Sequence, residues 1–188
     1  MDERLRVCLA RLGEHVDREA LALTGGVALG VHAPELARLA DVDFVARRMD
    51  AVRPSVTRQF LVSHYHVAPD KPIVQLVDVA TRLRIDVFPD RVDALARAIV
   101  HDGWRVVTAA DLLAHKRTLL AKPVDAKHWR DIVALSSLCG EPLPPEPALA
   151  PDVYCTDLAY VCARCERSRS PAFPIAPKRA IFALLGYV

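Results

Sequence analysis

The run Asp41-Val42-Asp43-Phe44-Val45 alternates polar and apolar residues, and this alternation constrains the fold more than any other feature of the chain. Successive side chains of a β-strand point to opposite faces of its sheet, so the run predicts a half-buried strand. The two carboxylates then lie together on one face, and the apolar side chains lie on the other. The chain is therefore expected to bring two negative charges to one surface of a sheet.

A second strand is predicted upstream of these aspartates, at Leu21-Ala22-Leu23-Thr24, and it stops at Gly25-Gly26. Residues 27–31 then favour a helix that ends before Pro34. Because glycine has no side chain, a glycine pair at such a junction lets a phosphate approach the backbone N–H groups and the positive end of the helix. The alternative is that this pair is an ordinary turn.

A third alternating run, Arg84-Ile85-Asp86-Val87-Phe88, can lie beside the strand that carries Asp41 and Asp43. Three carboxylates that lie together repel one another and raise their pKa values unless a cation binds between them. Mg²⁺ is an oxygen-preferring ion that is usually held by a few carboxylates and by substrate phosphates. The three aspartates therefore predict a site for two magnesium ions and for phosphoryl or nucleotidyl transfer, with Asp86 also helping to deprotonate the acceptor hydroxyl.

The remaining periodicities predict an α/β core, of the α+β kind, whose later part is mainly helical. Apolar residues at helical spacing predict an N-terminal helix of about four turns, and they are Leu5, Leu9, Leu12 and Val16. Strands are predicted at 60–67, 73–79 and 83–88, the last two forming a hairpin, and helices at 91–100, 109–121 and 127–138. We expect a mixed sheet flanked by helices within residues 1–139.

The composition changes at Gly140, because eight of the 14 prolines lie between Pro142 and Pro177. We expect residues 140–188 to form a proline-rich linker, to about residue 151, and then a cysteine-containing appendage. Three thiols in the appendage either bind zinc, with Cys139 as a fourth ligand, or are small packing residues; they are Cys155, Cys162 and Cys165. The appendage also carries basic residues that either contact a nucleic-acid backbone or form a solvated surface: Arg164, Arg167, Arg169, Lys178 and Arg179.

Composition adds little about function. Hydrophobic residues make up 52% of the chain and charged residues 26%, which is typical of a folded domain. The net charge of +2 does not by itself indicate a nucleic-acid binder. The N-terminal residues do not have the pattern of a signal peptide, and no apolar stretch approaches the roughly 20 residues of a membrane span. We therefore expect a cytoplasmic protein with reduced cysteines and no membrane association.

The order of the motifs resembles that of the DNA polymerase β-type nucleotidyltransferase superfamily, over about residues 20–138. Within it, the chain is most similar to small bacterial nucleotidyltransferases that include abortive-infection-type toxins and antibiotic-modifying enzymes. The resemblance implies a nucleotidyltransferase-type mixed sheet and an NTP substrate such as ATP. It also implies nucleotide contacts at Gly25 and Gly26 and metal ligands at Asp41, Asp43 and Asp86.

Two further segments look like the lysine-bearing helix of the family and the helix that follows it, and they are residues 111–116 and 127–132. By that resemblance Lys116 reaches the triphosphate, and Asp131 orients or braces it. The residues alone leave other interpretations open. Lys116 is then an ordinary exposed helix lysine, and Lys127 and Asp131 form an ion pair within one helix, because they are four residues apart.

We therefore expect an NTP-dependent transferase that uses Mg²⁺ to move a nucleoside monophosphate to a hydroxyl acceptor with release of pyrophosphate. The acceptor is either tRNA or another RNA, as in toxin-type relatives that have an antitoxin partner, or a small molecule such as an antibiotic, or a protein side chain. His64 and His66 share one face of a predicted strand, and they line the acceptor cleft, bind a metal or are surface residues. The alternative function is a nucleotide-binding or protein-binding module that keeps the fold without turnover.

Overall fold

The computed structural model describes residues 2–37, 39, 41–66, 72–121, 124, 126–149 and 184 of the chain. Within these residues seven strands form one mixed sheet in the order β3-β4-β5-β2-β1-β7-β6. The strands are β1 Leu21–Thr24, β2 Asp41–Ala46, β3 Phe60–His66, β4 Ile73–Asp78, β5 Arg84–Pro89, β6 Ile99–His101 and β7 Trp104–Val106. The α-helices are α1 Glu3–Leu12, α2 Gly25–His32, α3 Ala94–Arg97, α4 Ala109–Thr118 and α5 Ala126–Cys139. Short 3-10 helices cover Arg18–Ala20, Pro34–Leu36, Met49–Ala51, Pro54–Arg58 and Leu119–Ala121.

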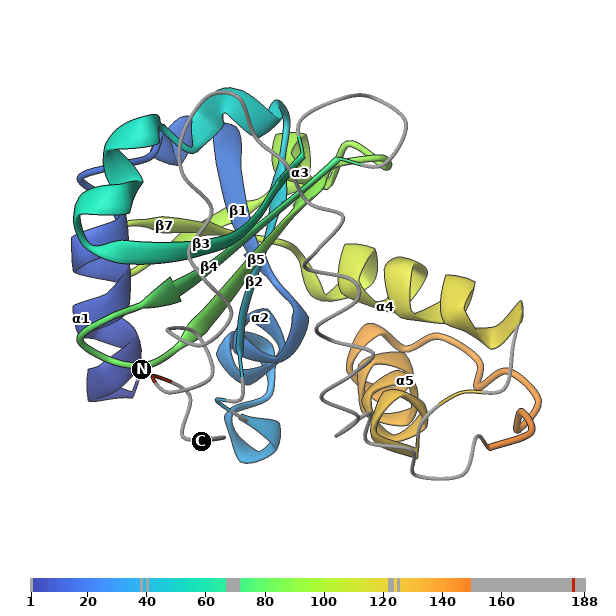
Figure 1. Cartoon of the computed structure of the whole chain (residues 1–188). Coiled ribbons are helices and arrows are strands. Elements are labelled where there is room, and N and C mark those ends of the chain that lie inside the picture. The colour runs from blue at the N-terminus through green and yellow to red at the C-terminus, as the bar shows by residue number, and fades with distance from the viewer. Residues whose placement is uncertain are drawn as a thin grey trace.

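The centre of the sheet is the pair β2 and β5, which run parallel to each other. Strand β1 pairs antiparallel with β2 on the other side, and β4 and β5 form the predicted antiparallel hairpin. In Figure 1 the helices α4 and α5 lie beside each other at one side of the sheet, and α2 contacts both β2 and α4. The expectation of a mixed sheet flanked by helices, with a helical later part, is confirmed.

One face of β2 is apolar and the other carries the carboxylates, as the alternation of this strand predicts. Val42 and Phe44 are fully buried and belong to one core, which also contains Leu9 of α1 and Ile85 of β5. Asp41 and Asp43 are only half-buried, because they lie on the opposite face of β2. The core therefore fixes the orientation of β2, and this orientation directs the carboxylates to the polar face.

The first helix is shorter than predicted. Asp2 caps α1 by accepting a hydrogen bond from the backbone N–H of Leu5, and the helix ends at Leu12. Gly13 follows at the C-cap, and glycine is a poor residue for continuing a helix. Val16 is buried as predicted, but it forms an isolated β-bridge with Val52 and is not helical.

The predicted helix at 91–100 is wrong over most of its length. Only Ala94–Arg97 is helical, and Ile99–His101 and Trp104–Val106 form an antiparallel hairpin at the end of the sheet. Asp102 and Gly103, which connect the two strands, have positive φ angles of 49° and 75°. Positive φ at both central residues is the mark of a type I′ hairpin turn, and Asp-Gly favours such a turn.

The C-terminal residues are described only in part. Residues 141–148 form no regular element, and Leu149 makes an isolated bridge with Val124. Residues 150–183 and 185–188 lie outside the described part, and with them the predicted zinc ligands Cys155, Cys162 and Cys165 and the basic residues of the appendage. The division into a core and an appendage stays a prediction. None of the helices described here has the length and apolar character that crossing a membrane requires.

Candidate active site

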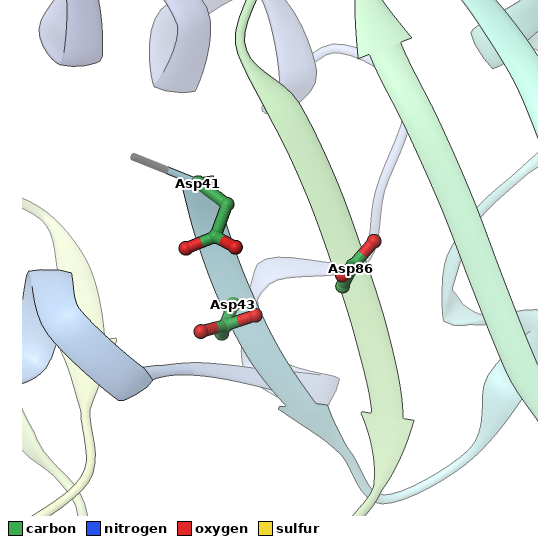
Figure 2. Close-up of side chains that lie close together, drawn as sticks. All are labelled: Asp41, Asp43 and Asp86. Atoms are coloured by element: carbon green, nitrogen blue, oxygen red, sulfur yellow. The ribbon is translucent and has the colours of Figure 1, made fainter. Parts of the chain in front are cut away.

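The structure brings the three predicted aspartates together on the polar face of the sheet. In the parallel register of β2 and β5, Asp43 lies directly opposite Asp86, and Asp41 lies two residues earlier on β2. One carboxylate oxygen from each side chain can be chosen so that all three lie within 4.8 Å of one another. Figure 2 shows Asp41 and Asp43 on one strand and Asp86 on the neighbouring strand. We call these three residues the aspartate triad.

Arg84 also belongs to this site, although sequence reasoning gave it no role. Its Nη2 atom lies 2.6 Å from Oδ2 of Asp41 and 3.3 Å from Oδ2 of Asp86. The sequence did contain a signal, because Arg84 is two residues before Asp86 on one strand and therefore shares its face. The guanidinium offsets part of the negative charge of the triad, but it is itself about half exposed to solvent.

The pKa of Asp43 shows how strongly burial and neighbouring charges disfavour the ionised carboxylate. Burial, followed by the charges of Asp41 and Asp86, raises the pKa of Asp43 from 3.8 to about 7, although Arg84 and Lys116 lower it. When three clustered carboxylates keep a proton near neutral pH, the nearby positive charges do not balance their negative charge. The donor set is all oxygen and anionic, which fits a hard divalent cation. The triad is thus a group that can hold a divalent metal ion.

The position directly after β1, the first residue of α2, requires a glycine, and this residue is Gly25. Its φ angle is +62°, in the left-handed region that side chains other than glycine rarely adopt. A Cβ atom at this position would also overlap Oδ2 of Asp43. The glycine therefore allows the Asp43 carboxylate to lie against the start of α2, where the helix dipole is positive. Gly26 follows in the first turn of α2. Contact of either glycine with a phosphate stays a prediction.

Lys116 is not an exposed helix lysine, so that interpretation is wrong. Its side chain is 9% exposed, and Nζ donates a hydrogen bond to Oδ2 of Asp131 at 2.8 Å. The same Nζ lies 3.3 Å from Nδ1 of His128. Asp131 and His128 are both on α5, so the neighbouring helix holds Lys116 in place. Lys116 lowers the pKa of Asp43, so its charge acts on the triad, and its contact with a phosphate stays a prediction.

A polar row crosses the sheet at the level of the triad. His64 on β3 lies opposite Gln75 on β4, Gln75 lies opposite Asp86 on β5, and Asp86 lies opposite Asp43 on β2. Gln75 donates a hydrogen bond from Nε2 to Oδ1 of Asp86 at 3.0 Å. Sequence reasoning missed Gln75, although it is a polar position within the predicted strand 73–79 and the hairpin register leads to it.

The two predicted histidines have different outcomes. His64 is buried, next to an irregularity in β3 between Val62 and His64, so it is not a surface residue. Among the described side chains, the group able to hold a metal contains the aspartates and not His64. The side chain of His66 lies outside the described part. A role of His64 in binding the acceptor stays a prediction.

The aspartate triad lies on two central strands of a mixed α/β sheet, an architecture consistent with a nucleotidyltransferase-like fold. No model of a known protein family matches the chain, and no curated protein matches it either. The polyadenylate synthase of Megavirus is similar in structure, with a TM-score of 0.50 and 13% identity, over 71% of this chain and 31% of the viral chain. The protein JHP933 from Helicobacter pylori gives a TM-score of 0.47 and 14% identity, over 72% of this chain and 64% of that chain. This chain therefore spans 31% of the length of the viral protein, and the likeness is one of fold.

Proposed function

We propose that this protein is a Mg²⁺-dependent nucleotidyltransferase, which moves a nucleoside monophosphate from an NTP to a hydroxyl acceptor and releases pyrophosphate. The aspartate triad carries this proposal, because three acidic side chains from two strands place oxygens within 4.8 Å of one another. The fold supports it, since a polyadenylate synthase has a similar fold. The pKa of Asp43, raised to about 7 by burial and by the charges of Asp41 and Asp86, supports it as well, because a cation would offset the repulsion among these charges.

In the proposed reaction, Asp41, Asp43 and Asp86 would hold two magnesium ions. When bound there, the ions would supply Lewis-acid chemistry for the acceptor oxygen and for the leaving pyrophosphate. A bond forms between the acceptor oxygen and the α-phosphorus, and the bond from the α-phosphorus to the oxygen that bridges to the β-phosphorus breaks. That oxygen leaves with the electron pair as part of pyrophosphate. The carboxylate of Asp86, whose Oδ1 accepts a hydrogen bond from Gln75, takes the acceptor proton.

The triphosphate is proposed to bind at the start of α2 and near Lys116. Gly25 and Gly26 present backbone N–H groups without side chains there, and the helix dipole adds positive charge. Lys116 supplies a full positive charge that already acts on Asp43. Asp131 would then be a positioning residue, which holds the Lys116 ammonium from α5.

For the acceptor we propose an RNA hydroxyl, such as one of tRNA. The support is the similar viral protein, whose name states that it makes polyadenylate. A small-molecule hydroxyl, as on an antibiotic, and a protein side chain are the other outcomes that the experiment below distinguishes. An antitoxin partner belongs to the RNA proposal, because only the resemblance of the sequence to toxin-type nucleotidyltransferases implies one.

The experiment uses purified full-length protein with Mg²⁺, each α-labelled NTP in turn and total tRNA. The double variant Asp41→Ala, Asp43→Ala removes two triad residues, and Asp50→Ala serves as the matched control, since Asp50 is an exposed aspartate on the Met49–Ala51 segment. Label on RNA in the wild type and in Asp50→Ala, but not in the double variant, is the expected result. Label on protein instead of RNA would identify a protein side chain as the acceptor.

Further outcomes distinguish a small-molecule acceptor from a protein that has no transferase activity. Absence of label, together with pyrophosphate release after addition of aminoglycoside-type polyols, indicates a small-molecule acceptor. The proposed function is wrong if the protein neither releases pyrophosphate nor binds any NTP in a Mg²⁺-dependent way. NTP binding that is equally tight with and without the triad would identify a binding module without turnover.

A further inference from the structure

We propose that Gln75 is a positioning residue for the metal centre, which holds Asp86 in the orientation that the cation requires. The inference rests on the proposed function, because it concerns the same carboxylate. Gln75 Nε2 lies 3.0 Å from Oδ1 of Asp86 and donates a hydrogen bond to it. Gln75 is not itself part of the group that can hold a metal.

The fold places Gln75 at this position with little freedom. Its neighbours on β4, Val74 and Leu76, are fully buried, so the alternation of the strand directs Gln75 to the polar face. The β4–β5 register sets Gln75 directly opposite Asp86. Directly opposite residues of an antiparallel pair have their Cβ atoms about 5 Å apart, a distance that a glutamine spans to reach a carboxylate. The orientation of the amide is therefore determined by the core on the other face.

The chemistry of the amide suits a residue that positions a metal ligand. An ionised carboxylate only accepts hydrogen bonds, so Gln75 must donate through its NH₂ group. This donor is neutral, and it takes up Oδ1 without adding positive charge to the place where a cation binds. Arg84 differs, because its guanidinium lies against Oδ2 of both Asp41 and Asp86 and repels a cation. Gln75 is therefore a donor that can orient Asp86 without repelling the metal.

Some residues hydrogen-bond to a metal-ligating side chain without contacting the metal. Mutation of such a residue commonly lowers metal affinity by about 10- to 100-fold. A hydrogen bond with only a structural role would instead stabilise the β4–β5 hairpin and leave the metal affinity unchanged. Metal affinity, measured apart from enzyme activity, therefore separates the two roles.

The experiment titrates full-length protein with Mn²⁺ alone, and electron paramagnetic resonance follows the free ion. Gln75→Leu removes the donor at similar volume, and Gln75→Asn keeps an amide that is too short to reach Asp86. Gln59→Leu is the matched control, because Gln59 Nε2 also donates to a carboxylate at 3.0 Å, that of Glu14, outside the triad. Thermal unfolding without Mn²⁺ first shows that each variant is folded.

We expect Gln75→Leu and Gln75→Asn to raise the Mn²⁺ dissociation constant by roughly 10- to 100-fold, and Gln59→Leu to leave it unchanged. In an Asp86→Asn background, Gln75→Leu should have no additional effect, because Gln75 acts through Asp86. The inference is overturned if Gln75→Leu binds Mn²⁺ like the wild type while Asp41→Ala, Asp43→Ala does not bind it. If that double variant binds Mn²⁺ like the wild type, the triad is not a metal centre, and the proposed function fails together with this inference.

Discussion

Asp43 and Asp86 lie directly opposite each other on two parallel strands, β2 and β5, at the centre of the sheet. Burial is the main cost of charging Asp43, and the like charges of Asp41 and Asp86 add to that cost. These effects raise the pKa of Asp43 to about 7. The relationship between these two residues is the physical basis for a cation site and for a stability that depends on pH.

The stability of the metal-free protein should fall as pH rises from about 4 to about 7. The pKa of Asp43 is raised from 3.8 to about 7 in the folded state, so the folded protein binds this proton more tightly than the unfolded chain. The free energy of unfolding therefore decreases through this window, by at most about 1.4 kcal/mol per pH unit from this group. Chemical denaturation at several pH values measures the slope.

The variant Asp43→Asn provides the comparison, because it has no titrating group at this position. The unfolding free energy of the wild type minus that of Asp43→Asn should fall as pH rises to about 7 and should then stay constant. Mg²⁺ should raise the stability of the wild type most above pH 7, where Asp43 is ionised. Identical pH slopes in the two proteins would show that Asp43 has an ordinary pKa.

Gly25→Ala should cost stability and metal affinity together. The alanine must adopt a φ angle of +62°, and its Cβ would displace the Asp43 carboxylate. The backbone strain alone is worth about 1–3 kcal/mol. Gly140→Ala is the control, because Gly140 has a φ angle of +66° and open space around the Cβ position. We expect both variants to lose stability but only Gly25→Ala to bind Mn²⁺ more weakly, and equal Mn²⁺ affinities would contradict this account of Gly25.

The pair of Lys116 and Asp131 should combine a structural and a functional role. Asp131→Ala leaves the buried Lys116 ammonium without its carboxylate, so we expect a loss of about 3–5 kcal/mol in unfolding free energy. The double variant Lys116→Met, Asp131→Leu removes both charges and should recover most of that loss. It should nevertheless bind NTP with Mg²⁺ more weakly than the wild type in isothermal titration calorimetry. Unchanged NTP affinity in the double variant would mean that Lys116 is purely structural.

Removal of the Arg84 charge should tighten the binding of a divalent cation. Arg84 lies against oxygens of Asp41 and Asp86, and a cation would be attracted to the same oxygens. Because the guanidinium is about half exposed, we expect Arg84→Gln to increase Mn²⁺ affinity by up to about fivefold, equivalent to roughly 1 kcal/mol or less. Arg105→Gln, which breaks an exposed pair with Glu19, is the control. A decrease in affinity in Arg84→Gln would assign Arg84 a supporting role at the metal site.

Much of the core could be predicted from sequence because local alternation carries the information. The polar–apolar pattern of residues 41–45 is enough to place Asp41 and Asp43 on one face, and the core confirms it. The pairing of Asp43 with Asp86 depends on which strands become neighbours and in which register, and no local pattern encodes that. The contact between Gln75 and Asp86 depends on the same register.

Other features of the structure differed from the predictions made from sequence, because tertiary contacts or turn chemistry determined them. Lys116 is buried only because α5 packs against α4 and supplies Asp131, which the sequence of α4 does not reveal. The hairpin of β6 and β7 was missed although Asp102-Gly103 favours a type I′ turn, because the residues before it also fit a helical period. At Gly25, sequence reasoning expected a phosphate contact, and the structure adds a steric requirement from Asp43.

Anomalous diffraction from crystals grown with Mn²⁺ and a non-hydrolysable NTP analogue would show whether the triad binds metal and nucleotide together. We expect manganese peaks among the carboxylates of Asp41, Asp43 and Asp86, with the triphosphate at the start of α2 and near Lys116. Manganese and nucleotide bound elsewhere, with the triad still held by Arg84, would contradict the proposal that this site transfers nucleotides.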